Sequence, residues 1–447
     1  MTAATITTAA DVARIMASHR NETTGTTPVQ HDDVPGFWNR REVLAHILEF
    51  ARARRAGPWA VLAVVLARAV ASVEPNVMLP PIIGGPVSLN LFAALVGPSG
   101  GGKGAAEGAA RNAVRFADHT GTDNDAETFT LGSGEGLART YRPNGNGSDA
   151  TNEDRSQWRS RALFTVAEVD TLAALGSRTG ATLLPELRKL YSGETIGFQN
   201  ASKVTRCVIP AHEYRACLIV GVQPAKAAPL IHDADGGTPQ RFVWLPVDDP
   251  DAPDTAPTEP PTLDVKAPKW GSEPVHLEVP DVARNSIDAH RLAVLRGEPV
   301  DPLDGHRMLS RLKVAAALSI LDGRSIVNAE DWDLAGVIMA KSDRTRAGIE
   351  HTLTEHTRRS NRARAEMDGE RAVIVDDVKA AGEYARVRKQ VLARLGRRPE
   401  GVPRGELGRA IKAELRVHVD DVLDDLVSEG VATTQPMPRS VLYILSS

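Results

Sequence analysis

The sequence of 447 residues has only two cysteines, and aromatic residues make up only 4% of it. Two cysteines cannot form a disulfide framework, so a small secreted disulfide-rich fold is excluded and a reducing compartment, the cytoplasm, is favoured. With so few aromatic side chains, the cores must be built from Ala, Val and Leu. Hydrophobic residues make up 42% and charged residues 25%, which is ordinary for a globular protein and excludes wholesale disorder.

The chain also lacks a large net charge, a signal peptide and a long hydrophobic run. Its 53 basic and 57 acidic residues give a net charge of −4, so any binding to nucleic acid must be local. The N-terminus has no charged start followed by an apolar core. The most apolar run, 59–73, is interrupted by Arg68 and is shorter than the roughly 20 residues of a membrane span. We therefore expect a soluble cytoplasmic protein without a membrane segment.

Residues that break helices and strands divide the chain into parts. At roughly 100–200 residues per domain, the length predicts two to four domains. Gly57-Pro58 separates two early helices. A later stretch is so rich in Pro and Asp that it predicts an extended linker or a surface strap. The expected parts are a flexible tail (1–30), an N-terminal helical segment (31–75), an α/β core (76–250), the Pro- and Asp-rich linker (251–280), a helical region (281–370) and a C-terminal unit (380–447).

Short apolar runs alternate with helical patterns in the α/β core. The run 89–96 precedes a glycine cluster and an Ala-rich helical pattern over 103–116. This order of strand, glycine loop and helix opens α/β nucleotide-binding folds. Further runs of strand length occur at 163–166, 217–222 and 242–247. Strands interleaved with helices predict a mainly parallel sheet covered on both faces.

The glycine cluster reads Gly97-Pro98-Ser99-Gly100-Gly101-Gly102-Lys103 and fits the phosphate-binding pattern G-x-x-x-x-G-K. In such a loop, backbone N–H groups and the start of the helix hold the phosphates, and the lysine reaches the β- and γ-phosphates. We therefore expect the loop and Gly104 to bind ATP, with Lys103 acting in catalysis. Gly104 stands where Ser or Thr normally offers a hydroxyl to Mg²⁺. Either water fills that coordination position, or hydrolysis is impaired.

Two acidic residues, Glu168 and Asp170, follow the run 163–166. A hydrolysing ATPase needs carboxylates at the end of a neighbouring strand to hold Mg²⁺ and to orient the attacking water. Residues two apart lie on the same side of an extended strand, so we expect both to be catalytic residues and metal ligands. Which of them takes which role stays open. The alternative for Asp170 is that it caps the following helix.

Two further polar residues stand at strand ends. Gln223 follows the run 217–222, where it would either lie beside the γ-phosphate and report its loss or form a turn before Pro224. Arg241 precedes the run 242–247. An arginine there is placed to leave its own subunit and stabilise transition-state charge on the neighbour's γ-phosphate. The alternative for Arg241 is a structural ion pair.

Helical patterns resume after the linker, at 282–296, 305–322 and 329–341, the last preceded by Asn328 as an N-cap. An arginine-rich helix is expected to follow, to about residue 370.

Three helices and two short strands are predicted for the C-terminal unit, which is the pattern of a winged helix. The helices are expected at 384–395, 404–412 and 417–429, and the strands lie around Pro436-Met437-Pro438. The third helix would enter the major groove of DNA, but its exposed face carries four aspartates that would repel phosphates. Either DNA is touched by basic surfaces elsewhere, or the unit docks a protein. The aspartates are Asp420, Asp421, Asp424 and Asp425, and the basic residues are Arg386, Arg388, Lys389, Arg394, Arg397, Arg398, Arg404, Arg409 and, in the wing, Arg439.

These residues together resemble AAA+-type replicative ATPases, notably minichromosome-maintenance helicases, in which an arginine and a phenylalanine precede a strand as Arg241-Phe242 do here. The closest resemblance is to ATPase/helicase proteins of actinobacterial prophages and integrative elements, often found beside primase-polymerase modules. The segments typical of that group are GSGEGL (132–137), LLPELRKLYSGETIGFQN (183–200) and GTPQRFVWLP (237–246). The resemblance covers about residues 85–340.

This resemblance implies an AAA+-like P-loop NTPase fold with a helical lid, whose arginine, here Arg307, contacts the nucleotide. It also implies a β-hairpin before the strand that ends at Gln223, carrying a pore lysine. Lys203 is the candidate, in a stretch that also holds Phe198 and Arg206, because a lysine can hold phosphate without reading sequence. The alternative is a solvated hairpin.

The expected function is ATP- and Mg²⁺-dependent DNA unwinding or translocation in the replication of a phage or mobile element. An arginine that acts on the neighbour's nucleotide, as Arg241 is expected to, cannot serve the site of its own chain, so we expect a homo-oligomeric ring, a hexamer. DNA is the expected ligand, and a primase or another replication protein is a candidate partner. One alternative is a helicase loader or replication initiator that uses ATP as an assembly switch. Another is a structural or interaction module that binds nucleotide without hydrolysis, with Gly104 marking the lost activity.

Overall fold

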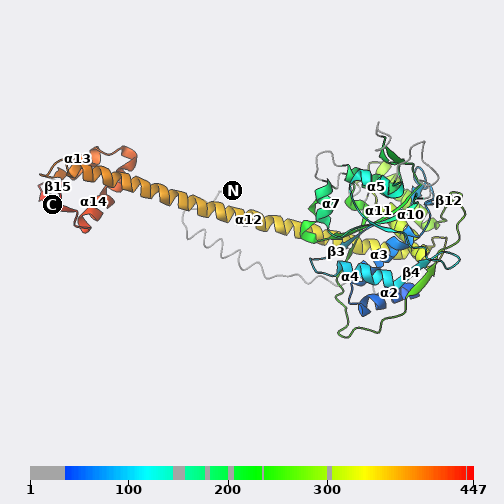
Figure 1. Ribbon diagram of the computed structural model, residues 1–447. Helices are drawn as coiled ribbons and strands as arrows, with labels where there is room; N and C mark the ends of the chain where they lie inside the picture. Colours follow the sequence, from blue (N-terminus) through cyan, green and yellow to red (C-terminus); the bar gives the residue numbers. More distant parts are fainter. Residues whose placement is uncertain are drawn as a thin grey trace. The chain divides into compact units, whose positions relative to one another are not determined.

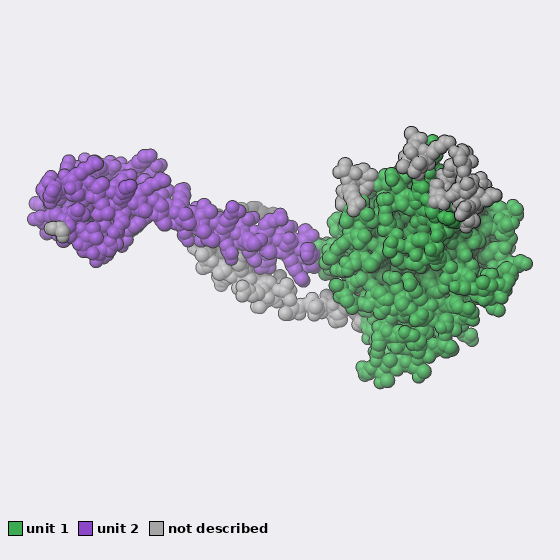
Figure 2. Space-filling view, in the orientation of Figure 1, with its two compact units in different colours: residues 1–354 green, residues 355–447 purple. Residues whose placement is uncertain are grey.

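The computed structural model describes residues 36–143, 157–176, 182–199, 206–233, 236–299, 305–438 and 440–446. The chain forms two compact units, Met1–Thr354 and Glu355–Ser447 (Figure 2). The predicted flexible tail lies outside the described residues. Among the residues described, no helix combines the length and the apolar composition that a membrane span requires.

A five-stranded sheet lies at the centre of the first unit (Figure 1). All four pairs of neighbouring strands are parallel. The prediction of a mainly parallel sheet is therefore confirmed, and the architecture is mixed α/β, consistent with a P-loop type of fold. The strands, in spatial order, are β10 (Phe242–Pro246), β3 (Phe92–Val96), β9 (Arg215–Val222), β6 (Arg161–Val166) and β5 (Thr128–Thr130).

Helices cover both faces of this sheet because side chains alternate along each strand. On β3, Ala93 and Leu95 join one hydrophobic core and Ala94 joins the other. The first core also holds side chains of α2 (Glu42–Ala53), α3 (Pro58–Ala71), α4 (Lys103–Ala113) and α11 (Arg307–Leu321). The second holds side chains of α5 (Gly134–Tyr141), α7 (Val169–Gly176), α8 (Leu183–Ser192) and α9 (Ala228–Ile231). Every residue of α3 is buried, as its almost uniformly apolar sequence requires, and its one charged residue, Arg68, forms an ion pair with Asp125.

The four predicted strand runs are all strands of this sheet, whereas β5 was not predicted because Thr-Phe-Thr is short and polar. The Ala-rich helix α4 is shorter than predicted. It ends at Ala113, and Val114–Ala117 forms β4 instead. This strand pairs in parallel with β11 (Leu263–Lys266), a partner that lies in the Pro- and Asp-rich segment and that no local pattern could indicate.

The Pro- and Asp-rich segment is a surface strap, one of its two predicted forms. Besides β11, it contains the short strand β12 (Val275–His276), which pairs with β1 (Val77–Leu79); β1 also pairs with β2 (Val87–Ser88). An ion pair from Arg54, which directly follows α2, to Glu259 holds the strap. Edge strands tolerate the prolines that a central strand would not.

After α10 (Asp281–Leu295) and α11, one continuous helix, α12 (Ala329–Leu395), spans 67 residues. The predicted end near residue 370 and the separate helix at 384–395 are therefore wrong. No proline interrupts this stretch, and glycine alone weakens a helix without ending it. In the first unit, α12 covers the edge of the sheet, where Trp244 N donates to Ser342 Oγ at 2.8 Å.

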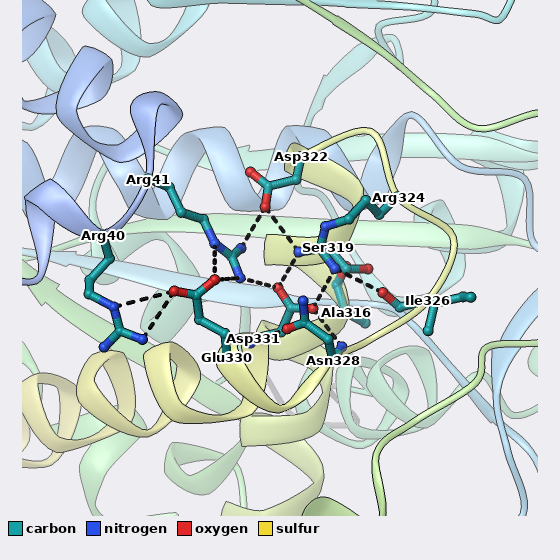
Figure 3. Close-up of polar contacts among 10 residues, drawn as sticks. All are labelled: Arg40, Arg41, Ala316, Ser319, Asp322, Arg324, Ile326, Asn328, Glu330 and Asp331. Atoms are coloured by element: carbon teal, nitrogen blue, oxygen red, sulfur yellow. Dashed lines mark hydrogen bonds and ion pairs between the residues drawn. The ribbon is translucent and has the colours of Figure 1, made fainter.

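A cluster of charged residues fixes the start of α12 (Figure 3). Asn328 caps the helix as predicted: Asp331 N donates to Asn328 Oδ1 at 2.9 Å, and Asn328 N donates to Asp331 Oδ2 at 2.8 Å. The Asp331 side chain is fully buried and forms ion pairs with Arg324 and with Arg41, which precedes α2. A buried carboxylate is tolerated only when it is paired in this way. The N-terminal helices are thereby tied to the turn between α11 and α12.

The second unit has its own hydrophobic core, formed by the end of α12, α13 (Arg404–Arg409) and α14 (Val419–Ser428). A three-stranded sheet completes it, in the order β13 (Val402–Pro403), β15 (Ser440–Leu445), β14 (Ala432–Met437). The second and third helices of the predicted C-terminal pattern and its two strands are present, and β13 is an addition that two residues were too short to signal.

Candidate nucleotide-binding site

Glycines allow the loop between β3 and α4 to adopt backbone conformations that other residues disfavour. Gly100 and Gly102 have φ angles of 73° and 95°, in the left-handed region that side chains disfavour. A Cβ atom at Gly97 would lie 2.1 Å from Val247 Cγ2, so no larger residue fits without displacement. Gly97 N also donates to Val222 O, at the end of β9, at 3.0 Å. The loop is therefore held at the carboxyl end of the central strands, where α/β folds bind ligands.

Lys103 is the first residue of α4, and its side chain folds back over the loop. Its Nζ donates to Gly97 O at 3.1 Å and to Pro98 O at 2.8 Å. Burial lowers the pKa of Lys103, and the nearby Glu168 carboxylate opposes that shift. Its ammonium group thus lies at the loop and beside one of the two predicted acidic residues.

Gly221, inside the buried strand β9, makes room for this lysine. A Cβ atom there would lie 3.2 Å from Lys103 Cδ and 2.1 Å from Ala167 O. Gly221 is not among the predicted site residues, although a glycine inside a strand is a signal of close approach by another group.

The exposed carboxylate of Glu168 lies next to Gln223, whose Nε2 donates to Glu168 Oε1 at 3.1 Å. The two residues follow β6 and β9, which are neighbours in the sheet. The structure therefore brings together three residues that the sequence predicted separately, namely Lys103, Glu168 and Gln223. Such an arrangement places a cation, a carboxylate and an amide at one edge of the sheet.

Asp170 does not lie on an extended strand beside Glu168, so that part of the prediction is wrong. Strand β6 ends at Val166, and Asp170 is the second residue of α7. Its carboxylate accepts a hydrogen bond from Lys226 at 2.5 Å, and this contact raises the pKa of Lys226. Lys226 lies in the 3₁₀ turn Pro224–Lys226 after β9 and is not among the predicted site residues.

The predicted metal ligands can be judged by their surroundings. Asp170 is already neutralised by Lys226, whereas Glu168 is exposed, accepts a hydrogen bond from the Gln223 amide and interacts at longer range with the Lys103 and Lys226 ammonium groups. Among the described residues, no three His, Cys, Asp or Glu side chains gather as a metal site would need. Mg²⁺ in phosphate sites is typically held by one or two carboxylates, substrate phosphates and water. The residues fit such a shared site through Glu168 and do not fit an all-protein one.

Arg241 lies at the opposite end of the strands from the loop. In the β3–β10 pair, Phe92 aligns with Phe242 and Val96 with Pro246; the loop follows Val96, whereas Arg241 precedes Phe242. At about 3.3 Å per residue, the two ends are roughly 13 Å apart. Its distance from the loop of its own chain means that Arg241 cannot act there.

The surroundings of Arg241 are mainly backbone carbonyls and an aromatic ring. Its Nη1 donates to Gly237 O at 2.7 Å and to Gly236 O at 3.2 Å, and its guanidinium lies 6.0 Å from the centroid of the Tyr191 ring. Burial lowers the pKa of Arg241. Among the residues that the structure describes, Arg241 forms no ion pair, although the Glu194 and Asp233 carboxylates lie near enough to oppose the fall in its pKa.

Arg307 is the first residue of α11 and lies at the same end of the sheet as Arg241. Its Nη2 is 3.0 Å from Asp343 Oδ2 of α12. The helix is fixed there by Ser310, whose Oγ donates to Gln240 O at 3.1 Å, and by Lys313, whose Nζ donates to Asn90 O at 2.8 Å. The structure therefore does not bring Arg307 to the loop of its own chain, contrary to the simplest form of the prediction.

A β-hairpin precedes β9, as predicted. Its strands are β7 (Ile196–Phe198) and β8 (Cys207–Ile209), with Phe198 paired with Cys207. Phe198 and Arg206 are half-buried. Lys203, the predicted pore lysine, and Arg439 of the wing lie outside the described residues.

The acidic helix of the second unit is partly neutralised by arginines that were predicted to contact DNA. Asp420 accepts from Arg404, with Arg404 Nε at 2.8 Å, and Glu429 pairs with Arg388. The acidic face therefore repels phosphates less than the sequence suggests. The two paired arginines are also less available to contact DNA. Exposed ion pairs are weak and exchange readily, so they leave both predicted roles of this unit open.

No protein-family model matches this chain, and no match is found among curated proteins.

Proposed function

We propose that the first unit binds ATP at Gly97–Gly104 and hydrolyses it, and that the protein uses this hydrolysis to move along DNA. The observation that carries the proposal is the meeting of Lys103, Glu168 and Gln223 beside a glycine loop at the carboxyl ends of parallel strands. In this arrangement Lys103 exchanges its loop carbonyls for the β- and γ-phosphates. Glu168 orients the attacking water, and Gln223 holds Glu168 in place. Glu168, together with phosphate oxygens and water, would hold a Mg²⁺ ion, which would supply neutralisation of the phosphate charge.

The location of two arginines supports assembly into a ring. Arg241 and Arg307 lie at the end of the sheet away from the loop of their own chain, so each would serve a nucleotide bound by a neighbouring subunit. An arginine supplied by a neighbour stabilises transition-state charge and couples hydrolysis to assembly. In this proposal α10, α11 and the start of α12 are the AAA+-type lid, the hairpin β7–β8 faces a central DNA channel, and the second unit is a winged helix.

Strand displacement tests this proposal. We expect the protein, with ATP and Mg²⁺, to unwind a forked DNA duplex and to hydrolyse ATP faster when DNA is present. A Lys103→Ala variant, assembled to the same size, is the control for unwinding that does not depend on ATP. Hydrolysis without unwinding would favour the loader or initiator. Absence of DNA-stimulated hydrolysis in a correctly assembled sample would rule out the helicase.

Gly104, the residue after Lys103, stands where a Ser or Thr hydroxyl would contact Mg²⁺, and a substitution there tests the effect of the missing hydroxyl. A Cβ atom at Gly104 would meet nothing within 4 Å, so a larger side chain fits. We expect Gly104→Thr to reach half-maximal turnover at a roughly tenfold lower Mg²⁺ concentration, an effect of about 1.4 kcal/mol, because its hydroxyl replaces a water ligand. Gly104→Val, which has the same shape without the hydroxyl, is the matched control. Equal Mg²⁺ dependence of the two variants would show that position 104 does not contact the metal.

A further inference from the structure

Part of α12 in the second unit is exposed around its whole circumference in the described part of the chain. Every residue from 356 to 382 is exposed. Isolated helices gain little stability by themselves, and most helices in proteins are stabilised by packing of one face. Ion pairs within the helix, such as Arg362 Nε to Glu366 Oε1 at 3.3 Å, add only a few tenths of a kcal/mol each. A helix of this length therefore calls for a partner along one of its sides.

One side of this segment carries a stripe of large apolar residues. Met367, Ile374 and Val378 are 64%, 62% and 68% exposed. At about 100° per residue, these three side chains fall within roughly 40° of one another around the helix, whereas the exposed Val373 and Val375 lie about 80–120° to either side of them. Ala363 and Ala381 lie on the same side and extend the stripe at both ends. Spacings of three, four and seven residues are those of a seam between two helices.

Charged residues of opposite sign flank the stripe. By the same periodicity, Glu366, Glu370 and Asp377 lie on one side of it and Arg364, Arg371 and Lys379 lie on the other, where Asp368 is an acidic exception. In a parallel pair of identical helices, the acidic side of each helix meets the basic side of the other. In an antiparallel pair, sides of like charge would meet and repel.

We propose that residues 363–381 of α12 pair with the same segment of a second copy of this chain, parallel and in register. The apolar stripe forms the seam, and the acidic and basic sides form ion pairs across it. This contact lies in the second unit and needs no nucleotide, so it is separate from the proposed ring contact through Arg241. It makes the second units associate in pairs.

Disulfide cross-linking of the full-length chain tests the pairing and its direction. Cys207 and Cys217 are both buried, and each is replaced with serine to give a background without thiols. In a parallel pair, Met367→Cys and Val378→Cys should each give disulfide-linked dimers at low protein concentration without nucleotide. Ala365→Cys, exposed on the opposite side of the same helix, is the matched control and should stay monomeric on a non-reducing gel.

Two results would overturn the proposal. One is the absence of dimers at positions 367 and 378, or cross-linking at 365 to the same extent. The other is a cross-link between the Met367→Cys and Val378→Cys variants when they are mixed, without cross-links of either variant to itself, because that pattern belongs to an antiparallel pair.

Charge reversal supplies an independent readout that needs no cysteine. Arg364→Glu with Arg371→Glu makes both sides of the stripe acidic, and Glu370→Lys with Asp377→Lys makes both sides basic. Each double variant should lose the dimer in sedimentation velocity, and an equimolar mixture should recover it as a heterodimer. Circular dichroism shows whether the helix is intact. Dimers of either double variant as strong as those of the unchanged chain would contradict the proposed ion pairs.

Discussion

Replacing Lys103 with alanine is expected to abolish ATP turnover. The ammonium group lies at the loop, held by Gly97 O and Pro98 O, and it is the cation at this loop placed to reach the β- and γ-phosphates. Loss of one such electrostatic contact typically lowers turnover by about 10²–10³-fold. Steady-state phosphate release measures the turnover, and binding of a fluorescent ATP analogue measures affinity.

The control is the same substitution at a lysine outside the proposed site. Lys266→Ala removes an exposed lysine of β11 in the strap, which lies outside the proposed site, and should leave turnover unchanged. Because the hydrogen bonds of Lys103 to described residues go to two loop carbonyls, the variant should also keep its thermal unfolding temperature. Turnover that survives Lys103→Ala would mean that the glycine loop has another role.

Replacing Arg241 with alanine is expected to remove hydrolysis while ATP binding stays largely intact. An arginine that stabilises the transition state from a neighbouring subunit contributes about 10³–10⁵-fold to turnover, and Arg241 lies too far from its own loop to bind the nucleotide held there. Loss of ATP affinity together with a lower unfolding temperature would instead indicate a structural role, through Gly237 O and the Tyr191 ring.

Mixing two inactive variants distinguishes action on a neighbour from action within one chain. Arg241→Ala keeps an intact Glu168, and Glu168→Gln keeps an intact Arg241. Where a Glu168→Gln subunit presents its arginine to the loop of an Arg241→Ala subunit, both groups are present at one site. We expect partial recovery of turnover in the mixture. An inactive mixture that nevertheless contains mixed assemblies would argue against an arginine acting across the interface.

Much of the candidate site could be predicted because its parts are encoded in contiguous residues. The glycine loop, the apolar runs beside it and the positions of Glu168 and Gln223 at strand ends are all local features. Parallel strands place their carboxyl ends at one edge, so these residues had to lie near one another once the sheet was parallel. The N-cap at Asn328 is local as well, since its partner Asp331 is only one helical turn away.

The features that were predicted wrongly depend on where helices and strands end and on which segments they contact. Asp170 was taken for a neighbour of Glu168 because the strand was expected to continue, but a helix begins at Val169 and Asp170 faces Lys226 instead. The helix end expected near residue 370 does not occur, because polar residues lower packing without ending a helix. Pairing of β4 with β11 joins segments nearly 150 residues apart in the chain, as the Arg115–Asp264 contact illustrates.

By itself the sequence determined a parallel α/β unit, a glycine loop that fits the phosphate-binding pattern, and a largely helical region after it, because hydrophobic period, glycine clusters and capping residues act over a few neighbouring positions. Only the tertiary structure decided that Lys103, Glu168 and Gln223 meet, that Arg241 and Arg307 lie at the far end of the sheet, and that α12 continues with one apolar side exposed. Strand order and helix packing set these distances. Both arise from contacts between segments that are remote in the chain, and local propensity carries no information about them.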